Sequence, residues 1–141
     1  MILITGGAYQ GKLEFAKSIC KKAEPVVAEG ERAALAELEQ AHIIAKFHLY
    51  IRRLMMENKN KQEDRNQQGN IQEDQIEEQV QKLIQKNPDV ILELTQLGCG
   101  VVPIDDFDRS YREKAGRIGC MLAKQAEQVW MVNAGIGMRL K

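Results

Sequence analysis

The first thirteen residues, MILITGGAYQGKL from Met1 to Leu13, decide the fold class. An apolar run from Met1 to Thr5 ends abruptly in two glycines, and apolar residues then recur at helical spacing from Leu13 onward. This order is typical of a strand, a glycine-rich turn and a helix. We therefore predict that the chain opens with a β-strand joined by a tight turn to an amphipathic helix.

The turn itself matches the pattern GxxxxGK of a phosphate-binding loop (P-loop). In such a loop, backbone N–H groups and the helix dipole surround a phosphate, and the lysine reaches its outer oxygens. The alternative is that the glycines only shape a turn. The last position usually carries a Ser or Thr whose hydroxyl binds magnesium, and Leu13 stands there instead. The predicted nucleotide-binding residues are Gly6, Gly7, Ala8, Tyr9, Gln10, Gly11, Lys12 and Leu13.

The rest of the chain alternates short apolar runs with helical patterns. Strands are predicted within residues 25–28, 42–47, 89–94 and 128–133, and helices within 31–41, 49–55, 76–84 and 107–122. The helix at 31–41 is expected to bury Ala34, Leu35 and Leu38. Strands that alternate with helices predict an α/β fold, here a P-loop NTPase-like parallel sheet flanked by helices on both faces. Ligands of such sheets bind at the carboxyl ends of the strands.

Length and composition favour one domain over residues 1–141, interrupted by a polar, exposed linker at about 57–75. The 20 basic and 20 acidic side chains give a formal net charge of zero, so we expect no nucleic-acid partner. No apolar run approaches the roughly 20 residues that span a membrane, and we expect a cytoplasmic protein. Three cysteines without metal-ligand spacing, Cys20, Cys99 and Cys120, are expected to be buried thiols.

Residues 94–141 carry a long gapless pattern besides the glycine loop. The residues that carry it are Gly98, Gly100, Val102, Pro103, Arg109, Tyr111, Arg112, Gly116, Arg117, Leu122, Ala123, Ala126, Val129, Gly135, Ile136 and Lys141. Together with the opening TGGAYQGK, this pattern resembles the bifunctional adenosylcobinamide kinase/adenosylcobinamide-phosphate guanylyltransferase family of cobalamin biosynthesis.

The resemblance implies phosphoryl transfer from GTP or ATP to the hydroxyl of adenosylcobinamide. It implies a nucleotide and a corrinoid as ligands and a homo-oligomeric assembly. The catalytic residues it favours are Lys12, Arg112 and Arg117, with the two arginines clamping the phosphate charge. The alternative for the arginines is pairing with Glu113 or Asp108 on a solvated helix face.

Several positions depart from the family pattern. Leu13 and Ala45 stand where the family has a hydroxyl and a carboxylate, and His48 stands where it has a threonine. The metal ligands are therefore left open, with Glu93 and Asp105 as candidate carboxylates. The segment that carries the family's nucleotide-accepting histidine is missing, so the guanylyltransferase step is expected to be lost. His42 and His48 are expected to be structural, with a phosphate contact as the alternative for His48.

These departures leave three functions in competition. The first is a shortened cobinamide kinase. The second is a catalytically idle nucleotide- or corrinoid-binding protein with the same fold, and the third is a structural subunit with a vestigial loop. Phosphoryl transfer to cobinamide discriminates the first from the second, and any ligand effect on melting discriminates the second from the third. No motif for reading the base chooses between GTP and ATP.

Overall fold

The computed structural model describes residues 1–63, 73–98 and 100–141. In chain order, the elements are β1 (Ile2–Gly6), α1 (Lys12–Ile19), β2 (Val27–Glu29), α2 (Leu35–Gln40), β3 (Ile43–Ala45), α3 (Phe47–Glu63), α4 (Glu73–Lys86), β4 (Ile91–Thr95), α5 (Asp106–Gln125), β5 (Gln128–Asn133) and β6 (Ile136–Arg139).

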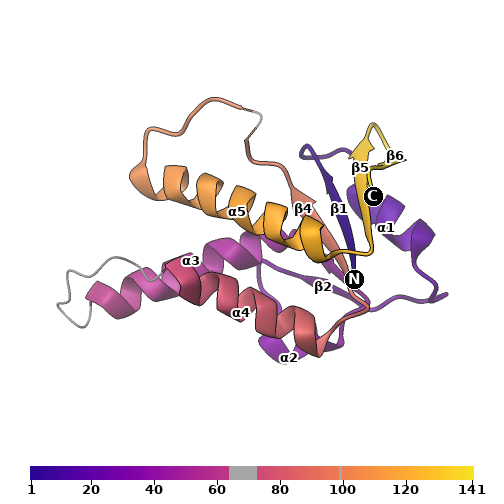
Figure 1. Ribbon diagram of the computed structural model, residues 1–141, viewed down its shortest axis with the longest axis horizontal. Coiled ribbons are helices and arrows are strands. Elements are labelled where there is room, and N and C mark those ends of the chain that lie inside the picture. Colours follow the sequence, from indigo (N-terminus) through magenta and orange to yellow (C-terminus); the bar gives the residue numbers. More distant parts are fainter. Residues whose placement is uncertain (64–72, 99) are drawn as a thin grey trace.

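The strands form one sheet in the order β2-β3-β4-β1-β5-β6. Every neighbouring pair is parallel except β5 and β6, which form an antiparallel hairpin. The carboxyl ends of β1, β3 and β4 therefore meet at one edge of the sheet, from which the glycine loop emerges (Figure 1). The predicted α/β fold with a P-loop-like parallel sheet is confirmed, apart from the antiparallel hairpin at one side.

Helices cover both faces of this sheet, and each face has its own core. The larger core lies under α3, α4 and α5, and its most deeply buried side chains include Phe47, Leu92 and Ile118. The smaller core lies under α1 and joins Ile4 and Ala16 to the neighbouring strands. The helix predicted within 76–84 is confirmed by α4, whose apolar residues Ile76, Val80, Leu83 and Ile84 are all buried.

The structure corrects the prediction for residues 31–41. The chain first turns at Glu29, whose carbonyl accepts hydrogen bonds from the N–H groups of Arg32 and Ala33. As a result α2 begins only at Leu35, which is half exposed, and Ala34 is exposed as well. Buried Leu38 and Ala33 anchor this segment instead.

The polar segment 57–75 is helical at both described ends, since α3 continues to Glu63 and α4 starts at Glu73. The remainder of the expected linker, residues 64–72, lies outside the described part of the chain. None of the helices described is long and apolar enough to cross a membrane. The expected burial of thiols is wrong for Cys120, which is exposed, and Cys20 is half-buried. Cys99 lies outside the described residues.

Candidate functional site: the glycine loop and its buried ion pair

The glycine loop depends on backbone conformations that favour glycine. Gly6 has φ 148°, and a Cβ added there would lie 2.2 Å from the carbonyl oxygen of Val132. Gly11 has φ 81° and directly precedes the first turn of α1. A side chain at either position would meet steric strain, so the turn between β1 and α1 requires both glycines.

The hairpin between β5 and β6 holds the loop from the other side. The side-chain Oε1 of Gln10 accepts a hydrogen bond from the backbone N–H of Ala134 (2.7 Å). The backbone carbonyl oxygen of Gln10 accepts a second one from the N–H of Gly135 (2.9 Å). Ala134 and Gly135 both have positive φ angles, as the two central residues of a tight hairpin require. The hairpin between β5 and β6 thus fixes the conformation of the glycine loop.

Lys12, the lysine of the loop, is almost fully buried. Its Nζ donates a hydrogen bond to the carbonyl oxygen of Gly7 (2.7 Å) and lies 3.4 Å from Oε1 of Glu93. The side chains of Lys12 and Glu93 are only 3% and 8% exposed. Burying an ammonium costs free energy unless it is paired, and Glu93 is the acidic partner that Lys12 has beside the loop.

Glu93 is held in turn by the neighbouring strand. Ile44 of β3 is in register with Leu92 of β4, which brings the next residues, Ala45 and Glu93, to the same level of the sheet. The N–H of Lys46 donates to Oε2 of Glu93 (3.0 Å). Lys46 has φ 52°, a left-handed conformation between β3 and α3. Both oxygens of the carboxylate therefore face cations or N–H donors.

The two candidate metal carboxylates differ sharply in their surroundings. Asp105 caps α5, because its side chain accepts a hydrogen bond from the N–H of Asp108 (3.0 Å). Leu13, at the position where a P-loop usually carries a magnesium-binding hydroxyl, packs against the smaller core with Ala16. Of the candidates, Glu93 alone stands beside the loop lysine. Among the residues described, no group of three or more His, Cys, Asp or Glu side chains is arranged to hold a metal ion.

The two histidines have different roles. Nδ1 of His42 accepts a hydrogen bond from the N–H of Val26 (2.9 Å), so this nitrogen holds the start of β2 in place. His48 lies in the first turn of α3, and its buried Nδ1 has no hydrogen-bond partner. Burial lowers the pKa of His48; the carboxylate of Glu93 opposes this shift, and the ammonium of Lys12 reinforces it. The imidazole is therefore within electrostatic range of the ion pair.

Arg112 and Arg117, the predicted phosphate clamp, lie on α5 and line a groove between this helix and the preceding loop. The guanidinium of Arg112 donates to the carbonyl oxygens of Gly98 and Val101. Arg117 pairs with Glu113 (2.6 Å), the arrangement weighed as the alternative. The described lining of the groove contains no residue of the glycine loop. The structure thus joins Lys12 to Glu93 and places the two arginines together elsewhere.

Comparison with known proteins agrees with this architecture. A family model described as cobinamide kinase / cobinamide phosphate guanyltransferase matches residues 28–140. The chain belongs to this family. The match begins after the glycine loop, so the geometry of Gly6–Lys12 is an independent observation.

Two curated relatives are the bifunctional adenosylcobalamin biosynthesis proteins CobU of Salmonella typhimurium and Escherichia coli. The chain is 39% identical to the first over 70 residues and 38% identical to the second over 73 residues. These alignments cover 47% and 49% of this chain, and 39% and 40% of the relatives. The chain thus matches about two fifths of the length of these members of the cobinamide kinase family.

Sequence reasoning missed the residues that support the site. The clip from Gln10 to the final hairpin was not foreseen, although the Ala134-Gly135 pair before a short apolar strand was the available signal. Arg52 and Arg53 of α3, which the sequence did not single out, are both half-buried. The guanidinium of Arg52 lies 5.7 Å from the ring centre of Tyr111, and that of Arg53 donates to the carbonyl oxygen of Ala33 (2.9 Å).

Proposed function

We propose that this protein binds a nucleoside triphosphate at Gly6–Lys12 and transfers its terminal phosphoryl group to the hydroxyl of a cobinamide. The observation that carries the proposal is the buried ion pair between Lys12 and Glu93 inside a glycine loop at the carboxyl edge of a parallel sheet. The family's description, cobinamide kinase, supplies the substrate class. GTP and ATP are both retained as donors.

Phosphoryl transfer depends mainly on positioning the donor and acceptor and on neutralising the phosphate charge. The bond between the γ-phosphorus and the bridging oxygen breaks and releases the nucleoside diphosphate, a bond from the phosphorus to the acceptor hydroxyl oxygen forms, and the hydroxyl proton passes to solvent water. Lys12 now donates to the carbonyl of Gly7, and a bound phosphate offers its ammonium a stronger, charged acceptor. Glu93 keeps that ammonium in place in the absence of nucleotide.

Magnesium would reach this site chiefly through the nucleotide. Mg²⁺ is usually bound by one or two carboxylates together with phosphate oxygens and water. The described residues offer Glu93 as the carboxylate beside the glycine loop, although Lys12 and the N–H of Lys46 compete with an ion for its two oxygens. Leu13 offers no ligand, and Asp105 caps α5. We therefore propose weak coupling between magnesium and nucleotide binding.

Arg112 and Arg117 are proposed as further cations that oppose phosphate charge, on the side of the acceptor. Their position on α5, next to the loop that follows β4, supports that side. The guanylyltransferase step is proposed to be absent, because His42 is engaged by the backbone and the family's histidine-bearing segment has no counterpart here. Cytoplasmic location and assembly of identical subunits remain expectations.

The experiment is to incubate the protein with GTP or ATP and cobinamide and to detect phosphorylated cobinamide by mass spectrometry. Lys12→Ala should abolish both nucleotide binding and product. Labelled GTP should leave no acid-labile label on the protein. Product formation by Lys12→Ala at the wild-type rate would refute the site, and a stoichiometric label on His42 or His48 would refute the loss of guanylyl transfer.

A second candidate function is a nucleotide- or corrinoid-binding protein without catalysis. It is favoured by Leu13, a partly buried side chain that packs against the smaller core at the position where a hydroxyl is usual. Under this alternative, nucleotide raises the melting temperature of the protein, yet no phosphorylated cobinamide forms. A structural subunit would show neither effect.

A further inference from the structure

Lys46 occupies the turn between β3 and α3, at the carboxyl edge of the sheet. Its backbone N–H donates to Oε2 of Glu93 (3.0 Å), and Oε1 of the same carboxylate lies 3.4 Å from Nζ of Lys12. One carboxylate therefore separates the backbone of Lys46 from the ammonium of the glycine loop. A lysine carries its ammonium on a flexible stem of four carbons, so the space beside Lys12 lies within reach of the Lys46 side chain.

The backbone of this turn is fixed by its neighbours. The N–H of Gly30 donates to the carbonyl oxygen of Ala45 (2.8 Å), and a Cβ added to Gly30 would lie 2.7 Å from the carbonyl oxygen of Lys46. Lys46 itself has φ 52°, in the left-handed region, which residues other than glycine rarely adopt. A glycine would adopt this conformation without strain. The lysine is therefore explained by its side chain and not by its backbone.

The side chain of Lys46 shares its acidic partner with a second cation. Its Nζ lies 3.2 Å from Oε2 of Glu29, at the end of β2, and the guanidinium of Arg32 lies 3.0 Å from the same oxygen. Glu29 thus faces two cations with a single charge, and it keeps Arg32 when Lys46 moves away. The Lys46 side chain is 46% exposed. Exposed ion pairs add little stability, so this contact is easily exchanged for another anion.

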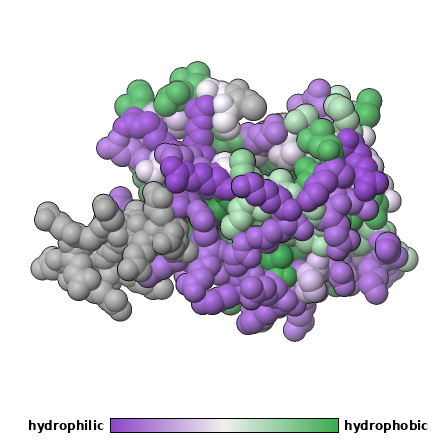
Figure 2. All heavy atoms as spheres, viewed as in Figure 1, coloured by the Kyte–Doolittle hydropathy of each residue, from purple (hydrophilic) through white to green (hydrophobic). Residues whose placement is uncertain are grey.

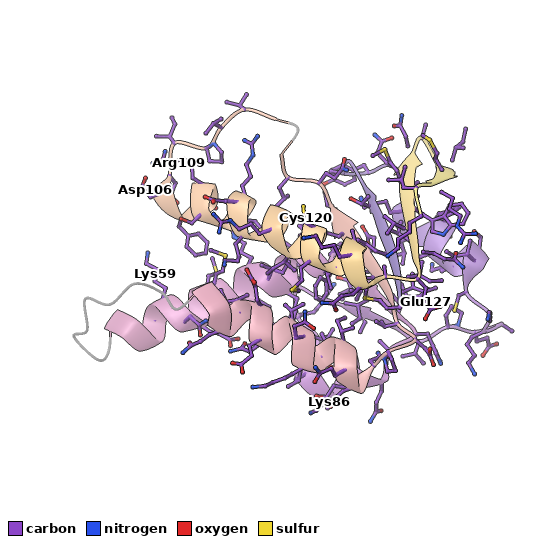
Figure 3. All side chains as sticks on the ribbon, viewed as in Figure 1. Lys59, Lys86, Asp106, Arg109, Cys120 and Glu127 are labelled. Carbon is purple, nitrogen blue, oxygen red and sulfur yellow. The ribbon has the colours of Figure 1, made fainter. Side chains whose placement is uncertain are left out.

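An exposed ion pair is ordinary in itself, since hydrophilic side chains cover most of the face that Figure 2 shows. The pair between Lys86 and Glu39 is an example, with Nζ and Oε1 2.7 Å apart. Figure 3 shows Lys86 at the end of α4, where the chain turns toward the start of β4. Lys46 differs in its place, because it stands at the opposite, carboxyl ends of the strands, beside the buried ion pair of the glycine loop.

In the described part of the chain, the residues around the glycine loop fit a magnesium ion poorly. Leu13 and Ala45 have apolar side chains. Glu93 has one oxygen beside Lys12 and the other bonded to the N–H of Lys46. Mg²⁺ demands oxygen ligands in near-ideal octahedral geometry, so such a set of residues holds it weakly. The charge of a nucleoside triphosphate therefore needs a second cation besides Lys12.

We propose that Lys46 supplies this cation: when nucleotide binds, its ammonium leaves Glu29 and binds the phosphate oxygens beside Lys12. Magnesium usually neutralises these oxygens, and an ammonium can do so as a compact charge. Arg32 stays on Glu29 and Lys12 stays near Glu93, so the exchange leaves neither carboxylate without a cation. The inference rests on the proposed function, because it assumes a nucleoside triphosphate at Gly6–Lys12.

The test is isothermal titration of the whole protein with GTP, and in parallel with ATP, in excess chelator and in magnesium. Lys46→Gln should weaken binding at least tenfold in chelator, because the phosphates lose a cation. In magnesium the loss should be smaller, since the ion that the nucleotide carries replaces part of that charge. Lys46→Arg should bind as wild type in both conditions. A purely structural role of Lys46 would give the same loss with magnesium and with chelator.

A second variant tests the exchange of partners. Glu29→Gln should tighten nucleotide binding severalfold in chelator, because it releases Lys46, and it should have no such effect when added to Lys46→Gln. Tightening in both backgrounds would show a general effect of removing a negative charge and would overturn the exchange. The matched control is Lys86→Gln, which removes a lysine from an exposed ion pair with Glu39 and should leave affinity unchanged.

The outcomes separate this inference from the proposed function. Lys46→Gln that binds nucleotide as tightly as wild type in chelator would overturn the role of Lys46 and leave the proposed function standing. An equal loss in magnesium and in chelator would do the same. Wild-type protein that binds nucleotide with the expected dependence on Lys46, but forms no phosphorylated cobinamide, would refute only the proposed transfer. Wild-type protein that binds neither nucleotide would overturn both.

Discussion

Glu93, in the middle of β4, lies beside Ala45 at the end of the neighbouring parallel strand β3, and the N–H of Lys46 donates to its carboxylate. Ala45 is the position at which the sequence resemblance leads one to expect an acid. The acid of this chain comes from the adjacent strand and still reaches the lysine of the glycine loop at 3.4 Å. Residues 45 and 93 therefore offer two positions for one carboxylate at the same level of the sheet, and in this chain residue 93 carries it.

The first prediction tests this exchange. Glu93→Ala should reduce GTP binding and phosphoryl transfer at least tenfold, because Lys12 loses its partner and magnesium its carboxylate. Ala45→Glu, introduced into the Glu93→Ala protein, should recover part of both, since it places an acid in the space just vacated. Ala45→Glu alone should not increase GTP binding or phosphoryl transfer, because it places two carboxylates close together. Full activity of Glu93→Ala would contradict the proposal.

The second prediction concerns the stability of the buried ion pair. Glu93→Leu should lower the free energy of unfolding by about 3 kcal/mol, because it leaves the ammonium of Lys12 buried and unpaired. Adding Lys12→Met should recover much of that loss. Urea unfolding of the two single variants and the double variant gives the coupling. If the loss of unfolding free energy in the double variant equals the sum of the losses in the two single variants, the pair is not coupled.

The third prediction concerns the clip between Gln10 and the final hairpin. Gln10→Ala should cost about 1 kcal/mol of stability through the lost hydrogen bond to the N–H of Ala134. It should also weaken nucleotide binding severalfold, because the loop is no longer held in its binding conformation. Gln85→Ala, at an exposed site on α4, is the control. Nucleotide affinity that survives Gln10→Ala unchanged would show that the loop holds its shape without the clip.

The fourth prediction concerns Leu13. Wild-type nucleotide affinity should change less than tenfold, or about 1.4 kcal/mol, between magnesium and chelator. Leu13→Ser should increase this dependence, because a hydroxyl then stands on the first turn of α1 beside the phosphates. Isothermal titration gives the nucleotide affinity of both proteins with magnesium and with chelator. A melting curve of each shows how much stability is lost with the apolar contact of Leu13. A strong magnesium effect in wild type would point to a metal ligand other than residue 13.

The fifth prediction follows from His48. Burial lowers its pKa below the ordinary value of 6.5, so between the two values the unfolded chain binds more protons than the folded one. Stability should therefore fall as the pH is lowered through this interval. His48→Gln should reduce the difference in unfolding free energy between pH 7.5 and pH 5, measured by urea titration. An unchanged difference would assign the acid sensitivity to other groups.

Much of the fold could be predicted because its signals are local. The run from Met1 to Thr5, the glycines after it and the apolar stripe from Ile76 to Ile84 each report on neighbouring residues, and the structure confirms all three. Residues 31–41 were predicted less well. A turn that begins at Glu29 includes the first residues of the expected helix, so the helix starts later. The strand β6 was missed because Ile136 and Met138 face solvent and leave no buried pattern.

The site was predictable in its parts and not in its pairing. The sequence named Lys12, Glu93 and Asp105, and the register between β1 and β4, which sets Glu93 opposite Ile4, makes Glu93 the partner of Lys12. Such a choice depends on contacts between residues about eighty positions apart. The same holds for the groove on α5, where the arginines were recognised but their association with the loop over the helix was not.

The clip between Gln10 and Ala134 has a consequence for biosynthesis. Its partners are 124 positions apart, so the chain must be synthesised through Ala134 before the glycine loop can be fixed. Contacts at such long range form late, since most of the chain must first be brought together. A nascent chain that has already paired β1 with β4 would still lack the clip, and we expect such a stalled intermediate to capture nucleotide poorly.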